Sequence, residues 1–386
     1  MKTESVRKVY ADCNATTPST QGHCEEVCKL VQSVYGNPSS IHHDGREAKL
    51  LMEEARELVA SFFSAERREI FFTSGATEAN NLAIQGACSY HAQRRRIQQP
   101  NLVLSQIEHS SVLTLAETLE ERGLCELRFV NVNSQGLFDR EGLLSAVDEN
   151  TVLISLILVN NEIGVLNPIQ PLVDPLKAKN PHAHIHMDAV QAYGKIDLTW
   201  LGSSKVDSAA ISGHKIGAFK GIGALYKKKD SPLHPLIIGG GQERGLRSGT
   251  ENFPGIISLS LKTKELSKKQ NWIEHLFPIR DRLLDGLLKW KGVRIHGDPE
   301  LCLPSTLNFY VEGVEGSRLM LLFDRARIAV SGGSACAAGG GKPSSVLKAL
   351  GCSEEEAANS VRLSFGEGSS LEDADRILEV LRTFLL

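Results

Sequence analysis

Between residues 69 and 226, short β-rich runs alternate with segments of helical periodicity, and this alternation constrains the fold more than any other feature. Strands are expected near 69–73, 102–105, 127–132, 151–159, 184–188 and 207–212. Helices are expected over 78–97, 111–122 and 139–148. Strands separated by helices imply crossover connections, and therefore an α/β fold with a mostly parallel, doubly wound sheet. Such sheets bind ligands beyond the carboxyl ends of their strands.

The pattern changes after the glycine-rich segment 239–249. A long amphipathic stretch runs from about 255 to 291 and is followed by expected strands near 293–297, 305–311 and 361–365. These elements predict a smaller α+β unit. Ser370, with Asp373 three residues later, forms a capping-box pattern that predicts the start of a final helix.

The composition excludes several classes of protein. Lys and Arg number 43 against 46 Asp and Glu, and a net charge of −3 does not indicate binding of nucleic acid through bulk charge. The N-terminus lacks the apolar stretch of a signal peptide, and the longest apolar run, 152–159, is too short to span a bilayer. The 8 cysteines include no CxxC pair, so no disulfide framework or structural metal site is indicated. We expect a soluble, cytoplasmic chain with no membrane or direct nucleic-acid partner.

The segment 73–80 (TSGATEAN) follows an expected strand and opens an expected helix. The amides of Gly75, Ala76 and Thr77 can therefore point at an anion, with the helix dipole behind them. On its own this segment is as consistent with an ordinary capped turn as with a phosphate cup. The sequence contains neither a GxGxxG motif after a strand nor a P-loop.

Lys215 and Asp188 add two groups that pyridoxal phosphate requires. Lys215 closes the segment 212–215 (SGHK) at the end of an expected strand, where a lysine can form a Schiff base with an aldehyde cofactor. Asp188 ends the preceding strand, and its carboxylate can pair with a pyridinium nitrogen so that the ring acts as an electron sink. A single lysine after a strand is usually a solvated surface residue. The cup, the carboxylate and the lysine together favour a pyridoxal phosphate site.

A rival interpretation uses His182, His184, His186 and Asp188, which share one face of an expected strand. Imidazoles and a carboxylate at this spacing could bind zinc and support the chemistry of a metal-dependent hydrolase. If the histidines have only a structural role, His182 lies at a loop and the imidazoles of His184 and His186 are packed or hydrogen-bonded. No second cluster supplies the remaining ligands, so no metal site is predicted.

Other candidates for chemistry each have a plain structural alternative. His109 follows a strand and could stack on a planar cofactor or move protons, or be an incidental loop histidine. Cys336 lies in a glycine-rich loop where a thiol could swing between two positions, or have no role. Arg362, on a late strand, could bind a carboxylate bidentately or form a surface ion pair. Asn160 and Asn161 end the buried run at its ligand-facing end.

Taken together, these motifs resemble the pyridoxal-phosphate-dependent cysteine desulfurases of the class V aminotransferase group, over nearly the whole chain. The matching segments are 12–18 (DCNATTP), 35–42 (YGNPSSIH), 73–81 (TSGATEANN), 159–164 (VNNEIG), 186–191 (HMDAVQ), 212–215 (SGHK), 239–250 (GGGQERGLRSGT), 332–336 (GGSAC) and 362–366 (RLSFG). The resemblance implies pyridoxal-phosphate fold type I, with a mostly parallel seven-stranded sheet in a large domain, 17–258. A smaller α+β domain, 1–16 and 259–386, would carry Cys336 and Arg362.

The resemblance also implies roles for the matching residues. Lys215 would hold the cofactor and move the substrate α-proton, Asp188 would pair with the ring nitrogen, and His109 would stack on the ring and assist proton transfer. Asn160 and Gln191 would contact the region of the cofactor's phenolic oxygen. The phosphate would be bound by Ala76, Thr77, Ser212 and His214, joined by Thr250 from the second subunit of a homodimer.

The implied activity is that of a cysteine desulfurase. Asn160 and Arg362 would bind the carboxylate of L-cysteine, and the thiolate of Cys336 would attack the sulfur of the cofactor-bound substrate. The products would be L-alanine and a persulfide on Cys336. The spacing from Cys336 to Pro343 is that of the family's mobile-loop branch, which favours transfer of the sulfur to a protein acceptor. Iron–sulfur cluster assembly and thio-cofactor or tRNA biosynthesis are the implied uses.

Several departures and one alternative substrate class stay open. Cys13 stands where a tyrosine is frequent, and 216–220 (IGAFK), with Phe219, replaces a more common turn after the lysine. The sequence ends at Leu386, without the tail that some members use to dock an iron–sulfur scaffold, which puts docking by that route in doubt. The same fold could act as a selenocysteine lyase or a cysteine sulfinate desulfinase.

Overall fold

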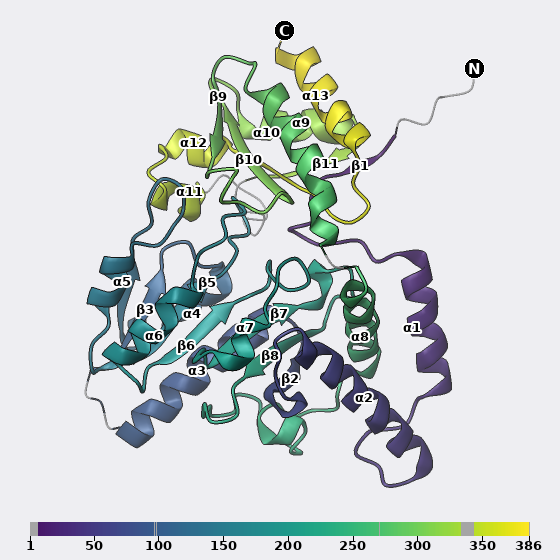
Figure 1. Ribbon diagram of the computed structural model, residues 1–386, viewed down its shortest axis with the longest axis vertical. Coiled ribbons are helices and arrows are strands. Elements are labelled where there is room, and N and C mark those ends of the chain that lie inside the picture. Colours follow the sequence, from purple (N-terminus) through teal and green to yellow (C-terminus); the bar gives the residue numbers. More distant parts are fainter. Residues whose placement is uncertain (1–6, 96, 98, 270, 333–342, 386) are drawn as a thin grey trace.

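The computed structural model describes residues 7–95, 97, 99–269, 271–332 and 343–385 (Figure 1). These residues contain a seven-stranded sheet in the order β2-β8-β7-β6-β5-β3-β4. The strands are β2 Ile70–Thr73, β3 Asn101–Ser105, β4 Glu126–Val130, β5 Thr151–Ile157, β6 His184–Asp188, β7 Ser208–Ser212 and β8 Gly223–Lys227. Among these described strands only β8 is reversed, because it pairs antiparallel with both β2 and β7. The predicted mostly parallel sheet is confirmed.

Helices cover both faces of this sheet. On β3, Leu102 and Leu104 pack in an apolar cluster with residues of α3 and α4, whereas Val103 belongs to the cluster that includes α6. Because successive strand residues point to opposite faces, a strand buried on both faces is a continuous apolar run. The covering helices are α3 Ala76–Arg95, α4 Ser110–Glu121, α5 Arg140–Ala146, α6 Gln170–Lys179 and α7 Trp200–Ser203.

A second unit lies at the top of Figure 1 and is built on an antiparallel sheet in the order β12-β13-β10-β9. Its strands are β9 Val293–His296, β10 Thr306–Val311, β12 Ser331–Gly332 and β13 Val361–Ser364. Its helices are α9 Phe277–Leu287, α10 Gly316–Arg325, α11 Ser345–Ala349, α12 Glu354–Asn359 and α13 Leu371–Leu385. Helix α13 begins directly after Ser370, whose N–H donates to Asp373 Oδ2 at 2.9 Å, as the capping pattern predicts. The chain start joins this unit, since β1 Val9–Tyr10 pairs with β11 Ile328–Ala329.

Three further helices pack together beside the central sheet (Figure 1). Helices α1 Gln21–Ser33 and α2 His43–Ser61 pack against α8 Phe253–Ser267. The predicted amphipathic stretch 255–291 is therefore divided between α8, a short 3₁₀ turn at Trp272–Leu276, and α9. The predicted boundary between residues 258 and 259 falls inside α8, and the division into two domains at that point stays a prediction.

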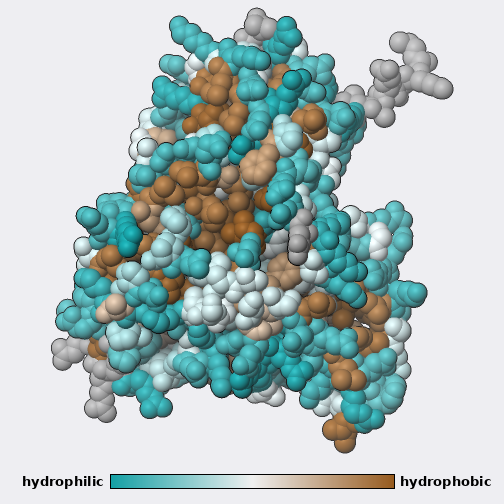
Figure 2. Space-filling model, in the orientation of Figure 1, coloured by the Kyte–Doolittle hydropathy of each residue, from teal (hydrophilic) through white to brown (hydrophobic). Residues whose placement is uncertain are grey.

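Apolar contacts connect the two units at their junction. Ile107 and Ile157, at the ends of central strands, pack in one cluster with Val346, Leu347 and Leu350 of the second unit. Figure 2 shows apolar side chains gathered between the upper and lower parts of the molecule on this face. The carboxyl ends of β3 and β5 are thereby fixed against α11. Over the described ranges, no helix is long and apolar enough to cross a membrane.

Candidate active site

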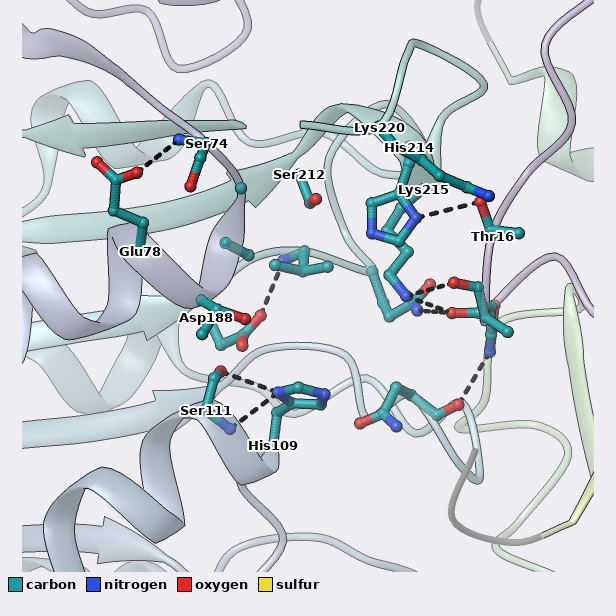
Figure 3. A pocket seen from close by; sticks show the side chains of 18 of the residues that line it. Thr16, Ser74, Glu78, His109, Ser111, Asp188, Ser212, His214, Lys215 and Lys220 are labelled. Atoms are coloured by element: carbon teal, nitrogen blue, oxygen red, sulfur yellow. Dashed lines mark hydrogen bonds between the residues drawn. The ribbon is translucent and has the colours of Figure 1, made fainter. Parts of the chain in front are cut away.

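A cavity of about 610 Å³ lies at the carboxyl ends of the central strands (Figure 3). Its lining side chains come from segments far apart in the sequence, because parallel strands bring their carboxyl ends to one edge. The lining includes Asn14, Thr16, Ser74, Gly75, Ala76, Thr77, His109, Ser111, Asn161, Asp188, Gln191, Ser212, His214, Lys215 and Arg362. Most residues that the sequence singled out therefore meet in one place.

One end of the cavity, which we call the cradle end, is formed by the turn between β2 and α3 together with Ser212. A Cβ at Gly223 would lie 2.7 Å from the backbone of Gly75, so β8 approaches this turn as closely as a glycine permits. Glu78 accepts the N–H of Ser74 at 2.9 Å and pairs with Arg247 at 2.8 Å, which fixes the turn. The first N–H groups of a helix lack intrahelical acceptors and attract anions. The cradle end can therefore bind a phosphate.

His214 lines the cavity beside the cradle end. Its Nδ1 lies 3.2 Å from Thr16 Oγ1. Burial, and then the charges of Lys215 and Lys220, lower the pKa of His214 to about 4. The imidazole is therefore neutral near pH 7, and it can contribute a hydrogen bond to an anion but no net charge.

Lys215 and Asp188 line the same cavity, as the sequence predicts. Lys215 follows β7, and its Nζ donates to the carbonyl oxygens of Asn14 at 2.7 Å and Ala15 at 2.9 Å. Asp188 ends β6 and is buried; its Oδ1 accepts the N–H of Val190 at 3.0 Å. The site thus presents a primary amine and a fixed carboxylate to one space.

Asn80 connects Asp188 with Ser111 and His186, and it was not predicted to have a role. Its Nδ2 donates to Asp188 Oδ2 at 3.1 Å and to Ser111 Oγ at 2.8 Å, and its Oδ1 lies 3.0 Å from His186 Nε2. The available signal was position, because residue 80 lies one helical turn after Ala76 and shares its face. Asn80 therefore holds the Asp188 carboxylate in place.

His109 is the N-cap of α4 and lines the cavity. Its Nδ1 accepts the backbone N–H of Ser111 at 3.1 Å and lies 2.9 Å from the hydroxyl of the same residue. An N–H can only donate, so Nδ1 is the acceptor and the neutral ring carries its proton on Nε2. This contact also fixes the orientation of the ring at the cavity wall (Figure 3).

The histidines of the rival interpretation are packed and hydrogen-bonded. His184 Nε2 and His186 Nδ1 both contact Ser208 Oγ, at 2.7 and 2.8 Å. Burial lowers the pKa of His184 to about 4 and that of His186 to about 3. His182 is exposed before the strand, and no group of three or more metal-ligating side chains is present within the described residues. Both nitrogens of His186 are engaged with protein atoms, which argues against the hydrolase.

Another part of the cavity wall, which we call the arginine end, is formed by Asn14, Asn161 and Arg362, and Asp12 contacts Arg362 from outside the lining. The guanidinium of Arg362 is 1% exposed; it donates to Asp12 Oδ1 and to the carbonyl oxygen of Asn161, both at 3.0 Å. Asn14 Nδ2 donates to the carbonyl oxygen of Asn161 at 3.1 Å. Among the described atoms Arg362 Nε has no hydrogen-bond partner, so a buried donor is left for a ligand.

The remaining predicted residues differ in their placement. Gln191 lines the cavity, but Asn160 does not: its amide donates to Ile107 O and accepts from the N–H groups of Glu162 and Ile163. Asn161, one residue later, lines the cavity in its place. Thr250 is exposed and lies outside the described lining, so its contact across a dimer stays a prediction.

Other site residues did not stand out in the sequence. Asp12 and Asn14 lie in a segment that had only a family match and no assigned role. The backbone N–H of Asn14 donates to Ser364 Oγ at 2.9 Å, so this segment joins the site through β13. Cys336, the predicted nucleophile, lies outside the described residues.

Comparisons with known proteins agree with this geometry. The aminotransferase class-V family model matches residues 9–377. A protein of Methanosarcina thermophila named cysteine desulfurase IscS is 38% identical over 379 residues, which cover 97% of this chain and 91% of the relative. A solved structure titled NifS-like protein has a TM-score of 0.90 and 35% identity, over 98% of this chain and 99% of its own. Another, titled SspA in complex with cysteine, has a TM-score of 0.79 and 31% identity, over 93% and 99%.

The family match extends across both units of the molecule, from β1 into α13. The structural match confirms the predicted fold type I architecture, including the mostly parallel seven-stranded sheet. The chain belongs to the aminotransferase class-V family.

Proposed function

We propose that this chain is a pyridoxal-phosphate-dependent cysteine desulfurase. It converts L-cysteine to L-alanine and passes the sulfur, through a persulfide on Cys336, to an acceptor protein such as an iron–sulfur scaffold. It works as a homodimer in the cytoplasm. The observation that carries the proposal is the convergence of Lys215, Asp188 and the first turn of α3 on one cavity. The relative named cysteine desulfurase and the structure titled as a complex with cysteine support the choice of substrate.

The residues present fit the cofactor. The cradle end supplies backbone N–H groups and the Ser212 hydroxyl for the phosphate. Asp188 provides a buried carboxylate for a ring nitrogen, and Lys215 provides the amine that would hold the aldehyde. The cavity volume of about 610 Å³ lies in the range of small-molecule sites. When bound, pyridoxal phosphate supplies an electron sink that stabilises negative charge on the substrate.

The chain's own residues would then orient the substrate and move its protons. Lys215 Nζ would move the proton of the substrate α-carbon, and His109 would hold or release a proton at Nε2. Arg362 would bind the substrate carboxylate, using the donor at Nε, which has no hydrogen-bond partner among the described residues. Because Arg362 is held by Asp12 and Asn161, its position is set before the substrate arrives.

The sulfur transfer balances without a further reactant. The thiol of Cys336 forms an S–S bond as the C–S bond of L-cysteine breaks. The electron pair of the broken bond stays with the substrate carbon, which takes up a proton to give L-alanine. The protein is left with a persulfide, which an acceptor thiol can then remove.

Peptide mass spectrometry after brief incubation of the purified protein with L-cysteine tests this proposal. We expect one added sulfur on the Cys336 peptide and an equal amount of L-alanine. Cys336→Ala should lose sulfur transfer to an acceptor, whereas Cys28→Ala, at an exposed cysteine, should keep it. Retention of full transfer by Cys336→Ala would refute the persulfide step. Faster turnover of selenocysteine or cysteine sulfinate would reassign the substrate.

A second experiment tests the cofactor. Lys215→Ala should lose the absorption of covalently held pyridoxal phosphate and its turnover, by a factor of about 10³ or more. Lys220→Ala, at a neighbouring lysine that lines the same cavity, should keep the covalent absorption. Equal absorption in the Lys215→Ala variant would contradict the role of Lys215.

A further inference from the structure

A second lysine is buried behind the candidate site. Lys195 follows β6, is 9% exposed, and donates from Nζ to Gln191 Oε1 at 2.7 Å. Within the described part of the chain, no carboxylate forms an ion pair with it. Buried lysines are usually paired with an acid, because desolvation of an unpaired ammonium is costly. Such a group calls for an explanation.

A chain of hydrogen bonds connects this lysine to Lys215. Gln191 Nε2 donates to the carbonyl oxygen of Asn14 at 3.2 Å, and Lys215 Nζ donates to the same oxygen at 2.7 Å. The two ammonium groups are therefore joined through one amide and one carbonyl. Both lysines also line a cavity of about 20 Å³ together with Cys13 and Glu367, which is room for about one water molecule.

The first consequence concerns Gln191, which lines the main cavity. An ammonium can only donate, so the amide oxygen of Gln191 must face Lys195 and its NH₂ must face Asn14 and the cavity. Without Lys195, the amide could turn over and present its oxygen instead. Lys195 therefore determines which polar atom of Gln191 a cofactor meets.

The second consequence is electrostatic. Burial lowers the pKa of Lys195 to about 8, Cys13 opposes this, and the charges of Lys215 and Arg362 add to it. Interaction between two titrating groups is reciprocal, so the Lys195 charge acts equally on Lys215. Glu367, the acid that lines the small cavity, is already paired with Lys262 and Lys269. It is therefore not available to neutralise Lys195 alone.

We propose that Lys195 is a positioning residue for the site: it fixes the Gln191 amide, and its charge disfavours the protonated form of the Lys215 nitrogen. This inference rests on the proposed function, because it concerns the nitrogen that would hold the cofactor. A cation beside a lysine is a recognised way to keep that lysine reactive near neutral pH. Here Gln191 bridges Lys195 to the carbonyl oxygen of Asn14, which Lys215 also contacts.

The test is a pH titration of the absorption band of the bound cofactor in the holoenzyme, with three substitutions. Lys195→Met removes the charge and the hydrogen bond, Lys195→Gln keeps a donor without the charge, and Lys195→Arg keeps both. We expect the midpoint to rise by about one pH unit in the Met and Gln variants, a tenfold change in proton affinity, and to stay in place in the Arg variant. We expect cofactor affinity to fall about tenfold in the Met variant and less in the Gln variant.

Lys262→Met is the matched control, because Lys262 is equally buried but is paired with Glu265 and Glu367. Its midpoint should equal that of the wild-type protein. Unchanged midpoints in all Lys195 variants would overturn the inference while leaving the proposed function intact. A wild-type protein that binds no pyridoxal phosphate at Lys215 would instead refute the proposed function. If the Lys195→Met variant does not fold, the Gln and Arg variants still test whether the Lys195 charge disfavours the protonated form of the Lys215 nitrogen.

Discussion

The two ends of the cavity are built in different ways. The cradle end is one continuous turn together with Ser212, and its main-chain N–H groups are available to donate to an anion. At the arginine end, Asp12, Asn14, Asn161 and Arg362 come from three distant segments and meet around the buried guanidinium of Arg362, which contacts the Asp12 carboxylate and the backbone carbonyl oxygen of Asn161. The cradle end depends on backbone geometry, and the arginine end depends on buried charge.

This difference predicts different responses to substitution. Changing a side chain at the cradle end leaves the N–H groups in place, so ligand affinity should fall with little loss of stability. Changing a charged side chain at the arginine end leaves a buried partner unpaired, so stability and substrate binding should fall together. Arg362→Ala and Ser212→Ala test that contrast directly, and substitutions of Glu162 and Asn80 test buried polar residues outside the cavity lining.

Arg362→Ala should have the largest effect. It removes a fully buried side chain and leaves the partly exposed Asp12 carboxylate with the Ser331 hydroxyl as its other partner, which together cost about 3–5 kcal/mol in the free energy of unfolding. Denaturant unfolding measures that loss, and the KM for L-cysteine should rise in parallel. Arg362→Lys keeps the charge but cannot reach Asp12 and Asn161 together, so it should recover stability more than substrate binding. Unchanged stability of Arg362→Ala would remove the contrast between the ends.

Glu162→Gln should give a pH-dependent effect of about 3 kcal/mol at most. Burial raises the pKa of Glu162 to about 7, although the hydrogen bond from the Ser344 hydroxyl, at 2.5 Å, and the charge of Arg362 oppose this. The folded state therefore holds this proton more tightly than the unfolded state does. The contribution of protonated Glu162 to the stability of the folded state is complete below about pH 4.5 and is lost as the pH rises to about 7.

Unfolding of the wild-type protein and of Glu162→Gln should be compared at several pH values. The Gln variant should gain stability relative to the wild-type protein between pH 4.5 and 7, because an amide does not titrate. A constant difference across that range would show that Glu162 keeps an ordinary pKa.

Asn80→Ala tests a buried residue that supports Asp188, with an expected loss of about 2 kcal/mol in the free energy of unfolding. The substitution removes the partners of Asp188 Oδ2 and His186 Nε2, both of which are buried. Asn81→Ala is the matched control, because Asn81 bonds within its own helix, to the carbonyl oxygen of Thr77. Thermal unfolding compares the two variants. Equal melting temperatures would show that Asn80 does not hold Asp188.

Ser212→Ala should have the smallest effect on stability. It removes one hydroxyl from the cradle end, so the affinity for pyridoxal phosphate should fall about tenfold, which corresponds to about 1.4 kcal/mol. Titration of the cofactor-free protein with pyridoxal phosphate, followed by absorption, measures this change. The melting temperature of the cofactor-free variant should match that of the wild-type protein. A lower melting temperature with unchanged affinity for pyridoxal phosphate would show that Ser212 supports the fold and does not bind the cofactor.

The sequence predicted six of the seven strands of the central sheet, because these short β-rich runs alternate with helical patterns. The reversed β8 was not predicted, since a run such as GALYK carries no signal of its direction. The cradle end was predictable for a similar reason: β2, the turn and α3 are contiguous. The arginine end was predicted only through Arg362, and the two adjacent asparagines 160 and 161 could not be told apart by pattern. They differ because the amide of Asn160 bonds to backbone groups, whereas Asn161 lines the cavity.

The sequence by itself therefore determined the fold class, the family and the residues whose neighbours in the chain create their environment, such as Thr77 and Lys215. Periodicity and local motifs carry that information, because helices, strands and turns are set by nearby residues. Tertiary structure decided which side chains become partners: Asn80 with Asp188, Asp12 with Arg362, and Lys195 with Gln191. The first two pairs join residues more than 100 positions apart. In the third pair, burial of Lys195 against the N-terminal segment gives the contact its electrostatic effect.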